Sequence, residues 1–149
     1  MGLYQRYQTD RTLEQDGAWV DFGDGVRLRV LSESTPKLRT LRNALRKKYR
    51  QHLTTLDVPA QIEDAMQVEQ AAAAVVDWEG VTDAGGAALT YSPDAARRIM
   101  TDLRELRKDV LYACANAETF RPAEVAEAMG KTSAPPLTPL SGTAPTLPA

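Results

Sequence analysis

The side chains that most often perform chemistry in proteins are scarce in this chain. His52 is the only histidine and Cys114 is the only cysteine. A catalytic Cys–His pair requires mutual reach and a third orienting group, and the sequence indicates neither. Zinc sites that need several His or Cys ligands are therefore excluded. Cys114 falls on the apolar side of an expected helix, where a free cysteine packs as a small hydrophobic residue.

A second group of candidate side chains is acidic and surrounds Trp78. Asp77, Glu79 and Asp83 could bind a hard metal ion, but the spacing of a twelve-residue calcium loop is absent. The neighbouring Gly85-Gly86 lacks the glycine spacing and the lysine of a phosphate-binding loop. A solvent-exposed turn with Trp78 anchored in the core is the simpler interpretation. No pair of carboxylates is singled out for acid–base chemistry, so we expect no enzyme, no cofactor and no metal site.

The strongest charge feature is a basic segment without any acidic residue. It holds seven of the eighteen cations, which are Lys37, Arg39, Arg42, Arg46, Lys47, Lys48 and Arg50. Removing these seven charges from the net charge of −2 leaves −9 on the rest of the chain. The asymmetry indicates an acidic partner or a phosphate backbone, but the favoured interpretation is a solvated helix face beside the protein's own acids Glu63, Asp64 and Glu69. Nucleic acid is the least favoured of these, because few aromatic residues accompany the cations and no helix-turn-helix spacing is visible.

The totals are typical of a small globular protein. The chain has 149 residues, of which 43% are hydrophobic, 26% charged and 6% aromatic. Such a length suits one domain with one modest core built mainly on aliphatic residues. The single cysteine fits a reducing compartment. The first residues lack the apolar segment of a secretory signal, and no apolar run approaches the roughly 20 residues that span a bilayer. We expect an intracellular protein without a membrane contact.

Helices must position these side chains, and prolines indicate where the helices begin. Proline is tolerated in the first turn of a helix, and helical periodicity follows Pro36, Pro59, Pro93 and Pro122. Thr35 and Ser92 are suitable N-caps. The pattern predicts helices over about 36–54, 59–76, 93–119 and 122–129. In the first of these, apolar residues recur every three or four positions and form one stripe that faces a core.

Strands are expected before the first helix. The Gly23-Asp24-Gly25 segment separates two apolar runs and predicts a β-hairpin over 18–31. A third strand could come from residues 81–91 through Val81, Leu89 and Tyr91. Residues 132–149 contain no charged residue and five prolines, which is typical of a flexible tail. We therefore expect an N-terminal arm (1–16), a single globular domain (17–130) and a flexible proline-rich tail (131–149).

The predicted fold class is mainly α, of the α+β type. A β-hairpin near the N-terminus is followed by a small bundle of about four helices and a disordered C-terminal tail.

Five segments of the chain follow one another in a distinctive order. They are Gly17-Ala18-Trp19-Val20, the basic helix ending Lys48-Tyr49-Arg50, Val76-Asp77-Trp78-Glu79-Gly80-Val81-Thr82-Asp83, Tyr91-Ser92-Pro93-Asp94-Ala95-Ala96 and Phe120-Arg121. In this order they resemble the tail assembly chaperones of long-tailed bacteriophages. The resemblance covers about residues 15–121 and is most specific from Trp78 to Pro93.

This resemblance implies a non-enzymatic factor in the cytoplasm of the infected bacterial host. Such chaperones coat the phage tape measure protein and help recruit tail tube subunits, and many exist in a short form and a frameshifted long form. Homo-oligomers are possible. The partner-binding side chains would be Arg39, Arg42, Arg46, Lys47, Arg50, Trp78 and Tyr91. Two alternatives stay open: a minor virion component such as a connector or tail-tip protein, and a small DNA-binding regulator that uses the basic helix 37–50.

Overall fold

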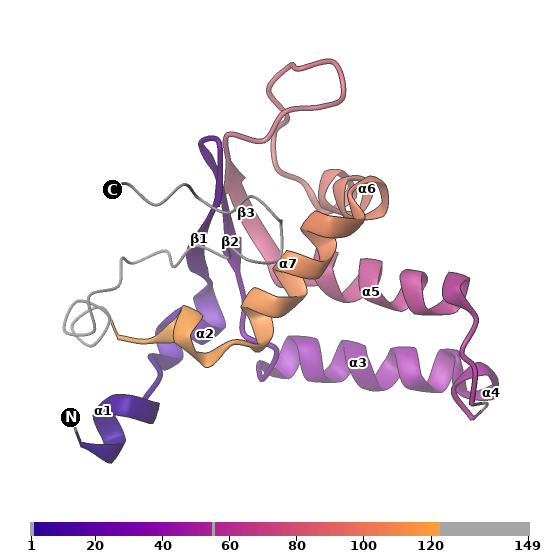
Figure 1. Ribbon diagram of the computed structural model, residues 1–149, viewed down its shortest axis with the longest axis horizontal. Helices are drawn as coiled ribbons and strands as arrows, with labels where there is room; N and C mark the ends of the chain where they lie inside the picture. The colour runs from indigo at the N-terminus through magenta and orange to yellow at the C-terminus, as the bar shows by residue number, and fades with distance from the viewer. Residues whose placement is uncertain (1, 55, 123–149) are drawn as a thin grey trace, which may run out of the picture.

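A three-stranded sheet and a layer of helices make up the computed structural model, which describes residues 2–54 and 56–122 (Figure 1). In chain order the elements are α1 (Leu3–Tyr7), α2 (Arg11–Asp16), β1 (Ala18–Gly23), β2 (Val26–Val30), α3 (Pro36–Lys48), α4 (Arg50–Leu53), α5 (Ala60–Ala74), β3 (Val75–Glu79), α6 (Pro93–Asp102), α7 (Arg104–Ala115) and the 3-10 helix η1 (Ala117–Phe120). The predicted fold class, mostly helical α+β, is confirmed.

The predicted hairpin is present as β1 and β2, which pair in antiparallel fashion with Val20 opposite Leu28. Asp24 and Gly25 in the turn have φ angles of 54° and 79°. This left-handed region favours Asp and Gly over most other residues, so the Asp-Gly pair fixes the tight turn.

The third strand is β3, not residues 81–91, so that prediction was wrong. β3 lies beside β2 with Trp78 opposite Leu28, giving the strand order β1-β2-β3. Valine and tryptophan favour strands because their side chains pack well on a pleated, half-buried surface. Residues 81–91 instead form a loop that an isolated bridge between Thr82 and Ala88 closes. The expected turn around Trp78 is therefore the end of a strand.

The expected helix caps are present, but two predicted helices are shorter than expected. Thr35 Oγ1 accepts a hydrogen bond from the Leu38 amide at 3.4 Å, and Ser92 Oγ accepts one from Ala95 at 3.0 Å. The helix predicted over 36–54 is interrupted at Tyr49, where α3 gives way to the short α4. The helix predicted over 59–76 ends at Ala74, because the next residue begins β3.

The helix predicted over 93–119 is three separate elements: α6, α7 and η1. Leu103 separates α6 from α7 with φ −114° and ψ 84°, and Asn116 separates α7 from η1. Apolar periodicity continues through Leu103, so it did not reveal the break. Leu103 is itself exposed. The buried side chain of Arg107 stabilises the break through a hydrogen bond to the Met100 carbonyl.

The core lies between one face of the sheet and the helices. The alternating residues Ala18, Val20, Leu28 and Val30 point into it, together with Trp78. Helices α5, α6 and α7 and the 3-10 helix η1 supply the opposite side, including Met100 of α6, Val110 of α7 and Phe120 of η1. The other face of the sheet carries the alternate residues Trp19, Asp21, Arg27, Arg29, Asp77 and Glu79, none of which is buried.

The N-terminal segment predicted as an arm contains α1 and α2 and joins the end of the described chain. The Asp10 amide donates to the Phe120 carbonyl at 2.7 Å, and Arg121 donates to the Gln8 carbonyl at 3.0 Å. The tail predicted over 131–149 lies outside the described residues, as does the helix predicted over 122–129 apart from residue 122.

Candidate functional site

The cations of α3 project away from the core because the apolar stripe of the helix faces inward. Leu38 and Leu45 are buried. Positions seven residues apart share a helix face, so Arg39 and Arg46 lie together on one exposed flank of this stripe. Lys47 and the first residue of α4, Arg50, are exposed beside them. These four residues, Arg39, Arg46, Lys47 and Arg50, are named the basic face.

The acidic residues of α5 do not neutralise the basic face, so the internal complement that the sequence also allowed is not formed. Asp64 pairs with Arg107 at 2.9 Å and with Arg104 at 3.8 Å, both in α7. Glu69 pairs with Arg97 of α6 at 3.1 Å. Within the described residues, no carboxylate oxygen of α5 lies within 4.0 Å of a basic-face nitrogen. The positive charge of this face is available to a partner.

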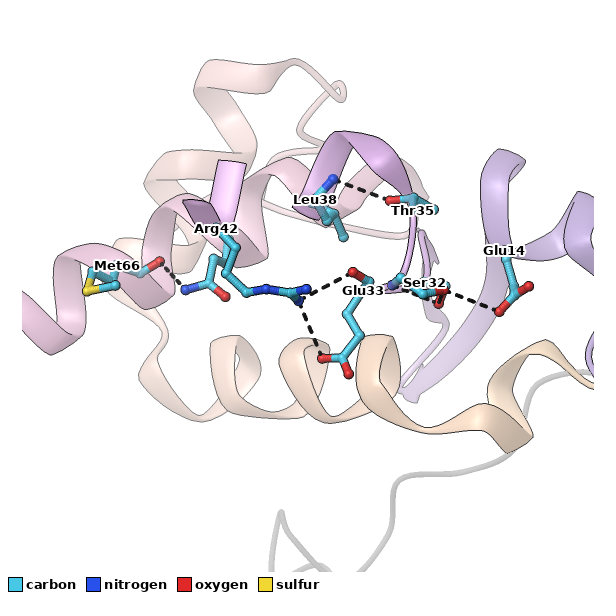
Figure 2. A network of polar contacts seen from close by, with 9 residues as sticks. Glu14, Ser32, Glu33, Thr35, Leu38, Arg42 and Met66 are labelled. Carbon is cyan, nitrogen blue, oxygen red and sulfur yellow. Dashed lines mark hydrogen bonds and ion pairs between the residues drawn. The ribbon is translucent and has the colours of Figure 1, made fainter. Parts of the chain in front are cut away.

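Arg42, also predicted to bind a partner, is occupied within the protein. Figure 2 shows its guanidinium directed at Glu33, whose backbone carbonyl accepts a hydrogen bond from Nη1 at 3.3 Å. The Glu33 carboxylate lies 4.0 Å from the same nitrogen. The Glu33 amide in turn donates to the Cys114 carbonyl at 3.0 Å. Arg42 therefore fixes the segment before α3 against α7.

A cleft of about 710 Å³ opens at the C-terminal end of α3. Tyr49, Ala65 and Val68 supply its apolar lining, and charged or polar side chains surround them. The remaining lining residues are Lys48, Gln61, Asp64, Glu69, Arg97, Thr101, Asp102, Arg104 and Arg107. An apolar lining within a rim of both charges suits an amphipathic helix that presents one anchoring side chain. The sequence did not indicate this cleft, because its wall depends on the break between α6 and α7.

Arg107 lines the cleft and joins α7 to α5 and α6. Its guanidinium is 3% exposed and donates three hydrogen bonds, to Asp64 Oδ1 at 2.9 Å, Gln67 Oε1 at 3.2 Å and the Met100 carbonyl at 3.2 Å. In a continuous helix the Met100 carbonyl would accept from residue 104. Arg107 supplies the missing donor, which explains why the chain tolerates a break between α6 and α7.

Trp78 and Tyr91, the other predicted partner-binding residues, lie apart from α3 on β3 and the loop that follows it. Trp78 is 7% exposed and its indole nitrogen donates to the Leu89 carbonyl at 2.7 Å. The Tyr91 hydroxyl donates to the Val75 carbonyl at 2.8 Å. The rings meet edge to face with centroids 5.1 Å apart. These contacts hold the loop against the sheet, so the structure gives Trp78 a place in the core.

Among residues 2–54 and 56–122, three side chains have shifted pKa values, and each shift is upward. Burial raises the pKa of the Cys114 thiol to about 12, with a further contribution from Glu33. Burial and then the Asp77 charge raise the pKa of Tyr91. Burial and then the Glu105 charge raise the pKa of Asp109.

No group of three or more His, Cys, Asp or Glu side chains in the described part of the chain is arranged to hold a metal ion. No helix among these residues has the length and apolar character needed to cross a membrane.

Comparison with known proteins gave one match. The family model described as YdaY prophage protein matches residues 33–131, which is about two thirds of the chain. The match spans α3, α5, β3, α6 and α7, and so includes the basic face and the cleft. No curated protein and no solved structure matches the chain.

Proposed function

This chain belongs to the YdaY prophage protein family, and from that premise we propose that it is a tail assembly chaperone. In this proposal it binds the tape measure protein of the phage in the cytoplasm of the infected host, helps recruit tail tube subunits, and catalyses no reaction. The observation that carries the proposal is the basic face of α3, whose charge no acidic residue of α5 offsets.

The cleft at the end of α3 is suited to binding a helical partner, here called the client. A tape measure protein is a long amphipathic helix that aggregates until tail tube protein encloses it. An amphipathic helix docks by placing apolar side chains in a groove, and Tyr49, Ala65 and Val68 offer such a lining. The basic face would steer an acidic or mixed-charge segment of that helix toward the cleft and would increase the association rate more than the affinity.

Many copies on one client would compensate for weak individual contacts. Neighbouring sites on a single long chain raise the effective concentration of one copy near the next. A small chaperone can therefore coat a long helix without a large interface of its own.

Coexpression with the tape measure protein of the same prophage tests this function. The expected result is that the tape measure protein stays in the soluble fraction and copurifies with this chain. A basic-face variant, Arg46→Gln/Lys47→Gln/Arg50→Gln, should lose most of this rescue. The matched control Arg6→Gln/Arg98→Gln/Lys108→Gln removes three exposed cations elsewhere and should keep it. Insoluble tape measure protein and no copurification with the unaltered chain would contradict the proposal.

The two alternatives give different results. A connector or tail-tip protein would be found by mass spectrometry at stoichiometric amounts in purified particles, whereas a chaperone would be missing or present in traces. A DNA-binding regulator would lose DNA affinity steeply with added salt, because phosphate contacts release counterions. The basic-face variant would then lose DNA binding and leave tape measure solubility unchanged.

A further inference from the structure

The end of the molecule that holds the hairpin turn and the start of the β3–α6 loop is acidic. Its five exposed carboxylates are Asp21, Asp24, Asp77, Glu79 and Asp83, named here the acidic end. The fold brings them together because the backbone at Gly80 approaches that of Gly25 so closely that no side chain fits between them. Figure 1 shows the hairpin turn and the β3–α6 loop at one end of the molecule.

The acidic end keeps an excess of negative charge, since its five carboxylates outnumber Arg27 and Arg29, which lie opposite Asp21, Asp77 and Glu79 in the sheet. Among the described residues, only Glu79 of the acidic end has an ion pair, with Arg27 at 3.4 Å, and both side chains are exposed. The Asp21 carboxylate accepts a hydrogen bond from the backbone amide of Gly23. The Asp83 carboxylate accepts hydrogen bonds from the amides of Gly85 and Ala87. These bonds shape the turns and leave the negative charge in place.

The basic face lies at the opposite end of the molecule. In Figure 1, α3 runs along the bottom while the hairpin turn and the β3–α6 loop are at the top. One copy cannot bring the two surfaces together. A second copy can, since each copy offers the surface that the other lacks.

We propose that the basic face of one copy docks on the acidic end of a second copy. Two basic faces repel each other, so the contact joins unlike surfaces and is heterologous. The docked pair retains one free basic face and one free acidic end, and association therefore continues into a head-to-tail series unless a ring closes. Exposed ion pairs are weak individually and screened by salt. The series forms at low ionic strength and high protein concentration.

Sedimentation velocity of the full chain tests this proposal. At about 50 mM salt, the mean mass should rise with protein concentration, and at about 500 mM salt it should return to that of one chain, because the Debye length shortens severalfold. The basic-face variant should stay monomeric in low salt. The variant Asp24→Asn/Asp77→Asn/Glu79→Gln should do so too, since it removes three charges from the acidic end. Asparagine at position 24 tolerates the positive φ of that residue. Asparagine at position 77 can still accept the hydrogen bond that the Trp78 amide donates there.

Mixing the two variants gives the sharpest result. The basic-face variant keeps an intact acidic end, and the acidic-end variant keeps an intact basic face. The mixture should form a dimer that grows no further, because the remaining two surfaces are both altered. Circular dichroism establishes that each variant is folded, and Arg6→Gln/Arg98→Gln/Lys108→Gln is the control that should associate normally.

Three outcomes would overturn the proposal: a monomeric unaltered chain in low salt, association that persists in either variant, or a mixture that stays monomeric. The experiment contains no client. Its failure would therefore leave the chaperone function standing, and failure of tape measure rescue would leave self-association standing.

Discussion

Arg107 and Asp64 join α7 to α5 through a 2.9 Å contact between Nη2 and Oδ1. The two partners are unequally exposed, since the arginine is 3% and the aspartate 41% accessible. The pair therefore lies at the boundary of the core, with its cation inside and its acid at the cleft.

Replacing Arg107 with lysine should destabilise the protein by about 2–4 kcal/mol, because a single ammonium cannot reproduce the forked contacts to Asp64, Gln67 and the Met100 carbonyl. Urea denaturation measures the change. Arg104→Lys is the control, because Arg104 pairs with the same residue, Asp64. Its pair is 3.8 Å long and exposed, so it should cost less than about 1 kcal/mol. Equal costs for the two variants would mean that Arg107 does not hold the helix break.

Removing the Tyr91 hydroxyl should cost about 0.5–1.5 kcal/mol, the usual net value of one intramolecular hydrogen bond. Tyr91→Phe keeps the edge-to-face contact with Trp78 but loses the donor to the Val75 carbonyl. The midpoint of denaturant unfolding reports the loss. Tyr112→Phe, on an exposed ring, should change stability by less than about 0.5 kcal/mol.

Replacing two glycines of similar backbone conformation with alanine should reduce stability by different amounts. Gly80 and Gly86 have φ angles of 75° and 86°, which cost a residue such as alanine about 1–2 kcal/mol. A methyl group at Gly86 meets no atom within 4 Å, but at Gly80 it would overlap the Gly25 carbonyl. Thermal unfolding should show a larger loss for Gly80→Ala. Similar losses would show that the hairpin turn moves aside freely.

The Cys114 thiol should make stability fall with alkaline pH. Burial raises its pKa from 9.0 to about 12, so above pH 9 the unfolded chain loses this proton while the folded protein keeps it. The stabilisation is complete below pH 9 and is lost as pH rises toward 12, by up to about 1.4 kcal/mol per pH unit. Unfolding free energies of the unaltered chain and of Cys114→Ala, compared from pH 8 to 10.5, isolate this effect. Parallel curves would contradict it.

Local signals in the sequence predicted the parts of the fold that local interactions decide. Thr35 and Ser92 cap their helices as expected, and the Asp-Gly turn closes the hairpin. The position of β3 was missed because it depends on pairing with β2, more than 40 residues earlier in the chain. Alanine-rich residues before Val75 favour a helix, and only the tertiary contact shows where the helix ends.

The site was predicted in part for the same reason. Helical periodicity placed Arg39, Arg46 and Lys47 on the exposed side of α3. It did not distinguish Arg42, whose contact to Glu33 depends on how the chain enters the helix. The cleft depends on Arg107, which to pattern analysis is one more polar position on an amphipathic helix.

Because β2 pairs with β3, the unit that folds is larger than the region that the family model matches. The matched region begins at residue 33, after the hairpin has ended. A fragment cut there would retain β3 and lose β2, which is its neighbour in the sheet. Leu28, across from Trp78, would be lost with it. The hairpin lies outside the matched region, and the matched region needs it in order to close its interior against water.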